Sequence, residues 1–384
     1  MTSTSFSAKK SLLLSFLVLV FICNACAARR LNVIDRCWRR DRHWAADRQR
    51  LARCAVGFAA PMHHNVGRGL RRYTVTDSSD DPVRPRPGTL RYGATVLPGK
   101  VWITFQGSMQ IKLVRPLLVK NFTTIDGRGA DVHVAYGAGI LLYQVSHVII
   151  HGIQVHHIRA QAAGQVMDPL GELIEMVAED GDAIRLVSSS EVWIDHNTLY
   201  SCEDGLLDVT LGSNAVTVSN NWFREHDKVM LLGHNDDFVQ DKTMHVTVAF
   251  NRFGPNCNQR MPRYGYAHLV NNLYDGWLEY AVGGSTHPII LSQGNLYVAS
   301  PGGNKKATLR MDAGGVRAMS ASWKWRSVND AFVNGAFFRQ TGTGPVRPPY
   351  GRKQKFRVAR AEAVRDLTRH AGALGCSAAT GVRC

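Results

Sequence analysis

Short hydrophobic runs recur along the middle of the chain, and each one ends in the same polar pattern. Five times, an apolar run is followed by Asn, one variable residue, and then Leu, Phe or Tyr. The asparagines are Asn197, Asn221, Asn251, Asn272 and Asn295, and successive ones lie 24, 30, 21 and 23 residues apart. A repeat of this length around a short β run predicts a coil of stacked strands rather than a globular layered fold.

The same spacing extends upstream of the asparagines. The run Val148-Ile149-Ile150 precedes Val192-Trp193-Ile194 by 44 residues, which corresponds to two turns of about 22 residues each. Turns of this length with three short strands predict an all-β fold, a parallel β-helix in which every strand pairs with the turns above and below. We expect the asparagines to occupy left-handed bends of this coil and to stack their amides from turn to turn.

Irregular segments flank the repeat. Residues Val33 to Val56 carry tryptophan, leucine and valine amid Arg and Asp, which predicts an N-terminal helix that caps the open edge of the stack. Residues Ala160 to Glu179 break the rhythm and are predicted to form an inserted loop. The tail from Gly303, rich in Arg and small residues, is expected to wrap around the stack or to cap its other end.

The first 27 residues have the pattern of a secretory signal peptide. Two lysines precede an apolar stretch, Ser11 to Cys23, and Ala25-Cys26-Ala27 follows it as a small-residue cleavage site. This stretch is too short to span a bilayer comfortably, and no later segment is apolar enough to do so. We therefore expect a secreted protein with no membrane contact in its mature form, in which residues 28–384 make a single domain.

Cleavage at this site would leave six cysteines, an even number that suits disulfides in a secreted chain. The local pairs that the sequence favours are Cys37 with Cys54 and Cys376 with Cys384. Cys202 and Cys257 either pair with each other or remain buried thiols. The triplet Asn121-Phe122-Thr123 is a sequon for glycosylation.

The formal net charge of +16 predicts a polyanionic partner. No helix-turn-helix, zinc-finger or RNA-binding motif is found, so nucleic acid is not expected. An acidic polysaccharide is the other candidate. Part of the excess charge lies in an Arg-rich N-terminal region and is expected simply to be solvated.

Acidic residues cluster on two adjacent turns of the predicted coil. In Asp180-Gly181-Asp182, both carboxylates lie on one side of an extended strand, and Asp204 and Asp208 follow one turn later. Asp beside Gly is also a common turn formula, which is the alternative for each acid taken singly. Together they predict a site for a hard cation such as Ca²⁺, which takes oxygen ligands. The spacing does not match an EF-hand, and no His/Cys cluster suggests zinc.

Six motifs in this region carry a resemblance to a known family. They are Asp180-Gly-Asp-Ala-Ile, Trp193-Ile-Asp-His-Asn, Cys202-Glu-Asp-Gly-Leu-Leu-Asp, His226-Asp-Lys-Val-Met-Leu-Leu-Gly-His, Phe250-Asn-Arg-Phe-Gly-Pro-Asn-Cys and Gln259-Arg-Met-Pro-Arg. Over residues 33–384, the chain resembles the plant pectate lyases of polysaccharide lyase family 1, including the pollen-allergen branch. The resemblance implies a right-handed parallel β-helix, most simply a monomer, that cleaves de-esterified pectin (polygalacturonate) in the cell wall by Ca²⁺-dependent β-elimination.

The resemblance also assigns roles to residues. It implies that Asp182, Asp204 and Asp208 bind calcium, with Asp180 as a fourth ligand. It places the substrate-binding lysine at Lys228 and the proton-abstracting arginine at Arg260. Arginine is an unusual base because its guanidinium is protonated in water, and neighbouring cations favour its neutral form.

One motif departs from the family pattern. The family continues Arg-x-Pro-x-x-Arg-x-Gly, whereas this chain reads Arg260-Met-Pro-Arg-Tyr-Gly265 and is two residues short. Counted from Gly265, Arg263 matches the second arginine of the family, which grips a substrate carboxylate. Counted from Arg260, it matches a variable position. The shortening predicts either a shifted strand register or a tighter turn before Tyr264.

Two other functions remain open at this point. The first is a β-helix that binds pectin with weak or no lyase activity, and the shortened arginine motif favours it. The second is a polygalacturonase on the same architecture, for which paired acids would hydrolyse the glycosidic bond without a metal.

Overall fold

The computed structural model describes residues 31–39, 44–235, 237–260, 266–284, 288–310 and 323–376. The predicted signal peptide, residues 1–27, and Arg263 lie outside these ranges. Within the described residues, no helix is long and apolar enough to cross a membrane.

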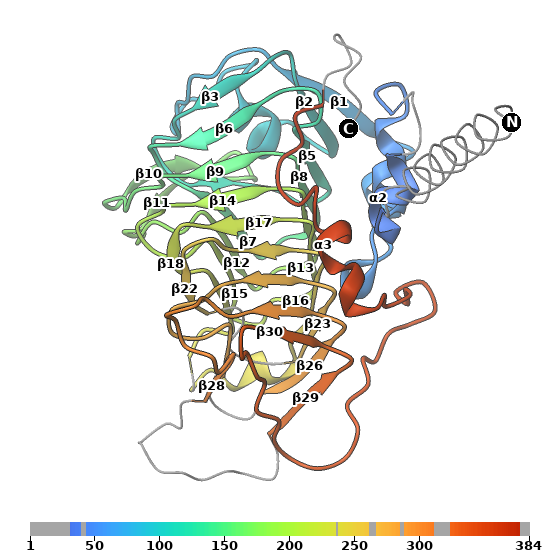
Figure 1. Ribbon diagram of the computed structural model, residues 1–384. Coiled ribbons are helices and arrows are strands. Elements are labelled where there is room, and N and C mark those ends of the chain that lie inside the picture. Colours follow the sequence, from blue (N-terminus) through green and yellow to red (C-terminus); the bar gives the residue numbers. More distant parts are fainter. Residues whose placement is uncertain are drawn as a thin grey trace, which may run out of the picture.

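Three stacked parallel sheets form the walls of a β-helix (Figure 1). Sheet 1 has ten strands, which are β1 Leu70–Val75, β2 Lys100–Phe105, β5 Thr123–Asp126, β8 Ser146–His151, β13 Ser190–Asp195, β16 Asn214–Ser219, β20 His245–Ala249, β23 Tyr266–Val270, β26 Ile289–Gln293 and β29 Lys324–Val328. Sheet 2 has nine, which are β3 Met109–Ile111, β6 Val132–Ala135, β9 Gln154–His156, β14 Thr198–Tyr200, β17 Trp222–Arg224, β21 Arg252–Phe253, β24 Leu273–Asp275, β27 Leu296–Val298 and β30 Ala331–Val333. Sheet 3 has five, which are β4 Leu117–Leu118, β7 Ile140–Tyr143, β12 Ile184–Val187, β15 Leu207–Thr210 and β19 Met230–Leu232.

The predicted asparagine ladder is confirmed. Each amide nitrogen donates to the amide oxygen of the asparagine one turn on, at 3.1, 3.1, 3.0 and 3.0 Å from Asn197 through to Asn295. The left-handed bend, however, falls one residue earlier than predicted. The residues with positive φ are His196, Asn220, Phe250, Asn271 and Gly294. Each ladder asparagine instead bonds two main-chain groups of the preceding turn: in Asn251, for example, the amide oxygen accepts from the N–H of Asn221 and the amide nitrogen donates to the carbonyl of Val218. The side chain thus replaces ladder bonds that a bend would lose.

The third position of the repeat fills the interior. Phe223, Phe253, Tyr274 and Tyr297 stack on one another with ring centroids 5.1, 4.8 and 4.6 Å apart and nearly parallel planes. Aliphatic side chains from all three sheets complete a single core. The preference for Leu, Phe or Tyr after Asn-x therefore reflects an inward position that is repeated on every turn.

The predicted N-terminal helix is present but is much shorter than residues 33–56. Helix α2 covers only Val33–Trp38, and a 3₁₀ helix, η1, follows at Arg48–Arg53. The Cys37–Cys54 disulfide, predicted and found, explains the break, because its Cα atoms are 5.6 Å apart. A continuous helix would separate these cysteines by about 25 Å. A continuous helix over residues 33–56 and a Cys37–Cys54 disulfide are therefore incompatible, and only the disulfide is confirmed.

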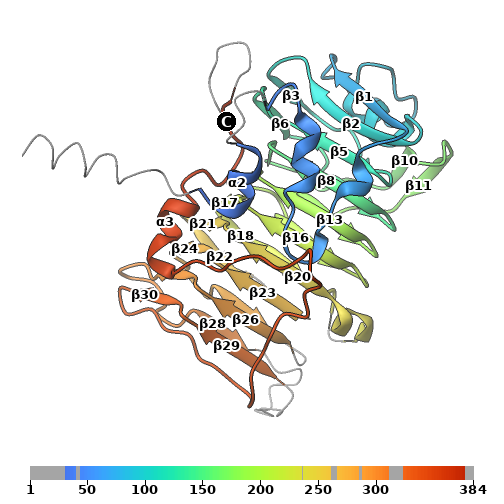
Figure 2. The same cartoon turned by 90° about the vertical axis from the view of Figure 1, so that its right-hand side faces the viewer.

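Helix α2 lies on the outer face of sheet 1, where Ile34 and Trp38 join a cluster that includes Trp102 and Trp193 (Figures 1 and 2). Two more 3₁₀ turns follow along this face, η2 Gly57–Ala59 and η3 His63–Asn65. The first turn of the stack is closed by the π-helical turn η4, Tyr92–Val96, whose Ala94 is buried in the core. Its sequence gave no apolar periodicity from which a helix could be predicted.

The other irregular segments match their predictions in outline. The insert at 160–179 carries an antiparallel hairpin of β10 Gly164–Met167 and β11 Leu173–Met176. Two short parallel pairs extend the stack, β18 His226–Lys228 with β22 Cys257–Gln259 and β25 Val282–Gly284 with β28 Thr308–Arg310. The 3₁₀ helix η5, Val239–Thr243, lies between β19 and β20. The tail wraps back over sheet 1 and forms η6 Ala361–Ala363 and α3 Val364–Leu367 (Figure 2).

The structure also places two cysteines of the stack. Cys202 and Cys257 are free thiols, and burial raises the pKa of each to about 12. The predicted pairing of Cys376 cannot be followed because Cys384 lies outside the described residues.

Candidate active site

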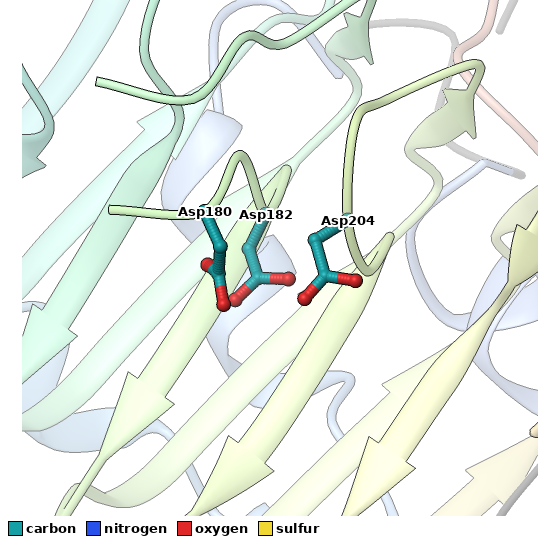
Figure 3. A group of neighbouring side chains, drawn as sticks. All are labelled: Asp180, Asp182 and Asp204. Atoms are coloured by element: carbon teal, nitrogen blue, oxygen red, sulfur yellow. The ribbon is translucent and has the colours of Figure 1, made fainter. Parts of the chain in front are cut away.

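Three acidic side chains converge at the edge of sheet 3. Asp180 and Asp182 lie in the segment that enters β12, and Asp204 lies in the turn that enters β15. Each offers a carboxylate oxygen, and these oxygens lie within 4.8 Å of one another (Figure 3). This is the arrangement that the spacing of the acids predicted.

Glycines allow the two turns to approach this closely. Gly181, between the first two acids, has φ of +102°, a backbone conformation that side chains rarely adopt. Gly205 follows Asp204, and its N–H donates to Asp182 Oδ1 at 2.7 Å. A Cβ on Gly205 would lie 2.5 Å from Asp208 Oδ1 and 2.7 Å from Asp182 Oδ1. Both carboxylates therefore pack against the bare Cα of Gly205, which places Asp208 beside the group of three.

Burial and mutual repulsion raise the pKa values of two acids of this site. Burial, followed by the charges of Asp208 and Asp180, raises the pKa of Asp182 to about 8. Burial and the charge of Asp204 raise the pKa of Asp208 to about 7. Buried carboxylates this close together repel one another, so the site favours either bound protons or a bound cation.

Basic side chains border the acids on the following turns. Lys228, at the end of β18, places its Nζ against Asp204 Oδ1. His226, on the same strand, hydrogen-bonds the carbonyl oxygen of Asp204 through Nε2, so this nitrogen carries the proton. Arg260 follows β22 directly, has φ of 63°, and accepts a hydrogen bond from Met230 N through its carbonyl at 2.6 Å. Burial raises the pKa of Asp208, and the positive charge of Arg260 offsets a small part of that rise, which puts Arg260 on the same side of the molecule as the acids.

One neighbouring cation was not singled out from the sequence. Arg185 on β12 is in register with Asp208 on β15, forms an ion pair with Glu179 at 2.8 Å, and lies 4.0 Å from Asp182 Oδ2. A polar residue inside the apolar run Ala183 to Val187 is typical of an outward position on a strand, so alternation could have identified it.

The fold and this site together define a class of protein: a parallel β-helix with a carboxylate cluster on one wall, bordered by lysine and arginine. Comparisons with known proteins agree with that class. A family model described as "Pectate lyase" matches residues 111–328. "Putative pectate lyase 2" of Arabidopsis thaliana is 49% identical over 348 residues, which cover 90% of this chain and 89% of that protein. "Pectate lyase 1" of Hesperocyparis arizonica is 47% identical over 92% of this chain and 97% of its own length.

Solved structures give the same result. The crystal structure of Jun a 1, the major allergen from cedar pollen, superposes with a TM-score of 0.85 at 47% identity, covering 89% of this chain and 99% of that one. A pectate lyase from Bacillus sp. N165, solved with trigalacturonate, shares the fold with a TM-score of 0.58 at 22% identity, covering 85% and 99%. The chain belongs to the pectate lyase family, and the predicted right-handed parallel β-helix is confirmed.

Proposed function

We propose that this protein is a secreted pectate lyase that cleaves polygalacturonate by calcium-dependent β-elimination. The observation that carries the proposal is the convergence of Asp180, Asp182 and Asp204 beside Lys228, with Arg260 on the adjacent turn. Membership of the pectate lyase family gives the reaction class.

The acidic cluster fits a calcium ion. Its donors are all carboxylate oxygens, which hard cations prefer. The raised pKa values of Asp182 and Asp208 result from burial and then from repulsion between the acids, and a divalent cation would offset both. We propose Asp180, Asp182, Asp204 and Asp208 as the ligands. When bound, Ca²⁺ would be held by these carboxylates and would supply positive charge that neutralises the negative charge developing on the substrate.

The basic residues supply the remaining roles. Lys228, whose Nζ pairs with Asp204 of the site, is proposed to bind a substrate carboxylate once the acids are occupied. Arg260 is proposed to accept the C5 proton of galacturonate. The electron pair of that C–H bond then forms the C4–C5 double bond. The C4–oxygen bond breaks with its electron pair on the oxygen, which takes a proton from water and becomes the hydroxyl of the new reducing end. The other product carries a 4,5-unsaturated sugar at its non-reducing end. Arg263 is proposed as a second carboxylate-binding arginine.

Family membership bears differently on the two other functions. A polygalacturonase loses support because the chain belongs to a lyase family. A pectin-binding protein of low activity remains the alternative, since it differs from the proposal only in turnover.

The context of the proposal is extracellular. We propose that residues 1–27 are removed as a signal peptide, and that the mature chain, residues 28–384, acts in the cell wall as a monomeric single domain. Plant pectate lyases at 47–49% identity match 90–92% of the chain, which supports a shared setting. Mass spectrometry of the secreted protein, giving an N-terminus at residue 28, tests this part.

The reaction is tested with polygalacturonate in the presence and absence of a calcium chelator. Ultraviolet absorbance of the unsaturated product should rise only with calcium. The variant Arg260→Lys should keep substrate binding but lose elimination, because lysine does not reproduce the guanidinium geometry. New reducing ends without absorbance would refute elimination, and binding without any cleavage would favour the alternative.

A further inference from the structure

The C-terminal tail carries a dense run of positive charge. Between Ala331 and Ala361 the sequence has seven basic residues and no acidic one. Five of the seven lie between residues 352 and 360, and all five are exposed: Arg352, Lys353, Lys355, Arg357 and Arg360. We call residues 347–360 the C-terminal strap.

The strap is held firmly against the outer face of sheet 1. The hydroxyl of Tyr350 lies 2.7 Å from Thr247 Oγ1 and 2.8 Å from His268 Nδ1. Gln354 exchanges hydrogen bonds with the η2 turn, and Ala359 bonds Asn271 through both its N–H and its carbonyl at 2.8 and 2.9 Å. These contacts fix the main chain, so the strap presents its charges without a large loss of backbone entropy.

Side chains of the strap alternate between the sheet and solvent. Gln354, Phe356 and Val358 are half-buried, whereas Lys355 and Arg357 between them are exposed. Successive outward side chains on an extended chain lie about 6.6 Å apart. Within the described residues, no ion pair involves any of the five exposed cations. The row of charge is therefore free to meet an external anion.

A cleft adjoins the strap and adds a further arginine. It has a volume of about 600 Å³ and lies between the strap and α2. Its lining residues include the basic Arg36, Arg357 and Arg360 and the apolar Phe250 and Val358. Guanidinium groups beside apolar side chains suit a sugar acid, which offers both a carboxylate and an apolar ring face.

This surface is separate from the candidate active site. Figure 1 shows α2, α3 and the tail on one side of the stack, and β18 and β22, which lead to Lys228 and Arg260, on the other. The sheets lie between the two surfaces. At physiological salt the field of an exposed charge is largely screened beyond a Debye length of about 8 Å. The charges of the strap therefore do not influence the chemistry of the acids.

We propose that the strap and its cleft form a second binding site for a linear acidic polysaccharide. The row of cations at short intervals, with no acid in the same segment, fits a polymer that carries one carboxylate on each sugar. Choosing de-esterified galacturonan as that polymer rests on the proposed function. Such a site holds the protein on the wall polymer while the candidate active site acts on another stretch of the polymer.

The test measures binding of long polygalacturonate to the full secreted protein at about 0.1 M salt. A chelator is present, so that calcium-dependent binding at the candidate active site does not contribute. The variant is Lys353→Glu/Lys355→Glu. The matched control is Arg72→Glu/Lys112→Glu, two exposed cations near the N-terminal end of the stack that have no ion pair within the described residues. We expect roughly tenfold weaker binding for the strap variant, because exposed attractions become repulsions, and less than a twofold change for the control.

The salt dependence and turnover complete the test. The strap variant should show a shallower fall of affinity with salt, since fewer counterions are released. It should cleave trigalacturonate with calcium as fast as the unchanged protein. Equal losses in the strap variant and the control, or tight single-stranded DNA binding lost in parallel, would overturn the proposal in favour of unspecific charge. Strap-dependent binding with no unsaturated product would refute the proposed lyase function and leave the strap site standing.

Discussion

The substitution Gly205→Ala tests the acidic site without removing any ligand. Its Cβ would lie 2.5 Å from Asp208 Oδ1 and 2.7 Å from Asp182 Oδ1, distances that real Cβ atoms do not show. The carboxylates of Asp208 and Asp182 must therefore retreat by at least about 0.5 and 0.3 Å, respectively, merely to reach 3.0 Å, the shortest separation that real Cβ atoms show. Gly205 does not have positive φ, so its main chain accepts alanine. The cost to folding should be that of an overpacked site, about 1–3 kcal/mol.

Function should suffer more than stability. Displacing a positioned group by ~1 Å can cost about 100-fold in rate, so a shift of half that size should lower calcium affinity and turnover about tenfold each. Calcium titration by calorimetry and the absorbance assay measure the two losses. Gly107→Ala is the matched control, because nothing lies within 4 Å of the Cβ it would add. A folded Gly205→Ala protein with unchanged calcium affinity would refute Asp182 and Asp208 as a joint metal site.

Three further predictions follow from the contacts. Lys228→Ala should weaken binding of polygalacturonate more than that of highly methyl-esterified pectin, since only the former is fully charged; equal losses in a binding assay would reduce Lys228 to general surface charge. Asn251→Ala strips two buried main-chain groups of their partners and should lower the free energy of unfolding by ~4 kcal/mol; a urea titration showing less than ~1 kcal/mol would contradict this. In the folded protein the pKa values of Asp182 and Asp208 are raised to about 8 and about 7. The folded metal-free protein therefore binds more protons than the unfolded chain in this range, and its free energy of unfolding should fall as pH rises from about 4 to 8. Thermal unfolding in chelator across this range, with Asp208→Asn showing a flatter profile, measures the effect, and a stability that rises over this window would contradict it.

The repeating part of the fold could be predicted because every turn repeats the same physical demand. A buried asparagine must bond the turns on both sides, and the residue two positions later must fill the interior. Both demands appear in the sequence as one pattern. The position of the bend could not be read in this way, since residues as different as His196 and Phe250 occupy it. The ladder bonds, rather than the intrinsic preference of the residue, impose the left-handed backbone there.

Segments outside the repeat were harder to predict because distant contacts shape them. Apolar residues between Val33 and Val56 fit a helix locally, yet the disulfide at Cys37 folds this segment back on itself. The acids of the site could be predicted, since one turn of the coil brings Asp182 and Asp204 together. The role of Gly205 could not, because it depends on side chains that approach from two different turns.

The shortened arginine motif can now be placed against the strands on either side of it. Before the motif, Gln259 pairs in register with Lys228, and the carbonyl of Arg260 is bonded to Met230. After it, β23 pairs with β20 so that Ala267 and Leu269 face the core. Asn272, just after β23, also keeps its place in the asparagine ladder, since Asn251 bonds it at 3.0 Å. The described strands on both sides of the motif are therefore in register with their neighbours, and residues 261–265 lie outside the described residues. Lys228 and Arg260 are held by main-chain bonds made before the shortened segment, so the shortening bears chiefly on the proposed role of Arg263.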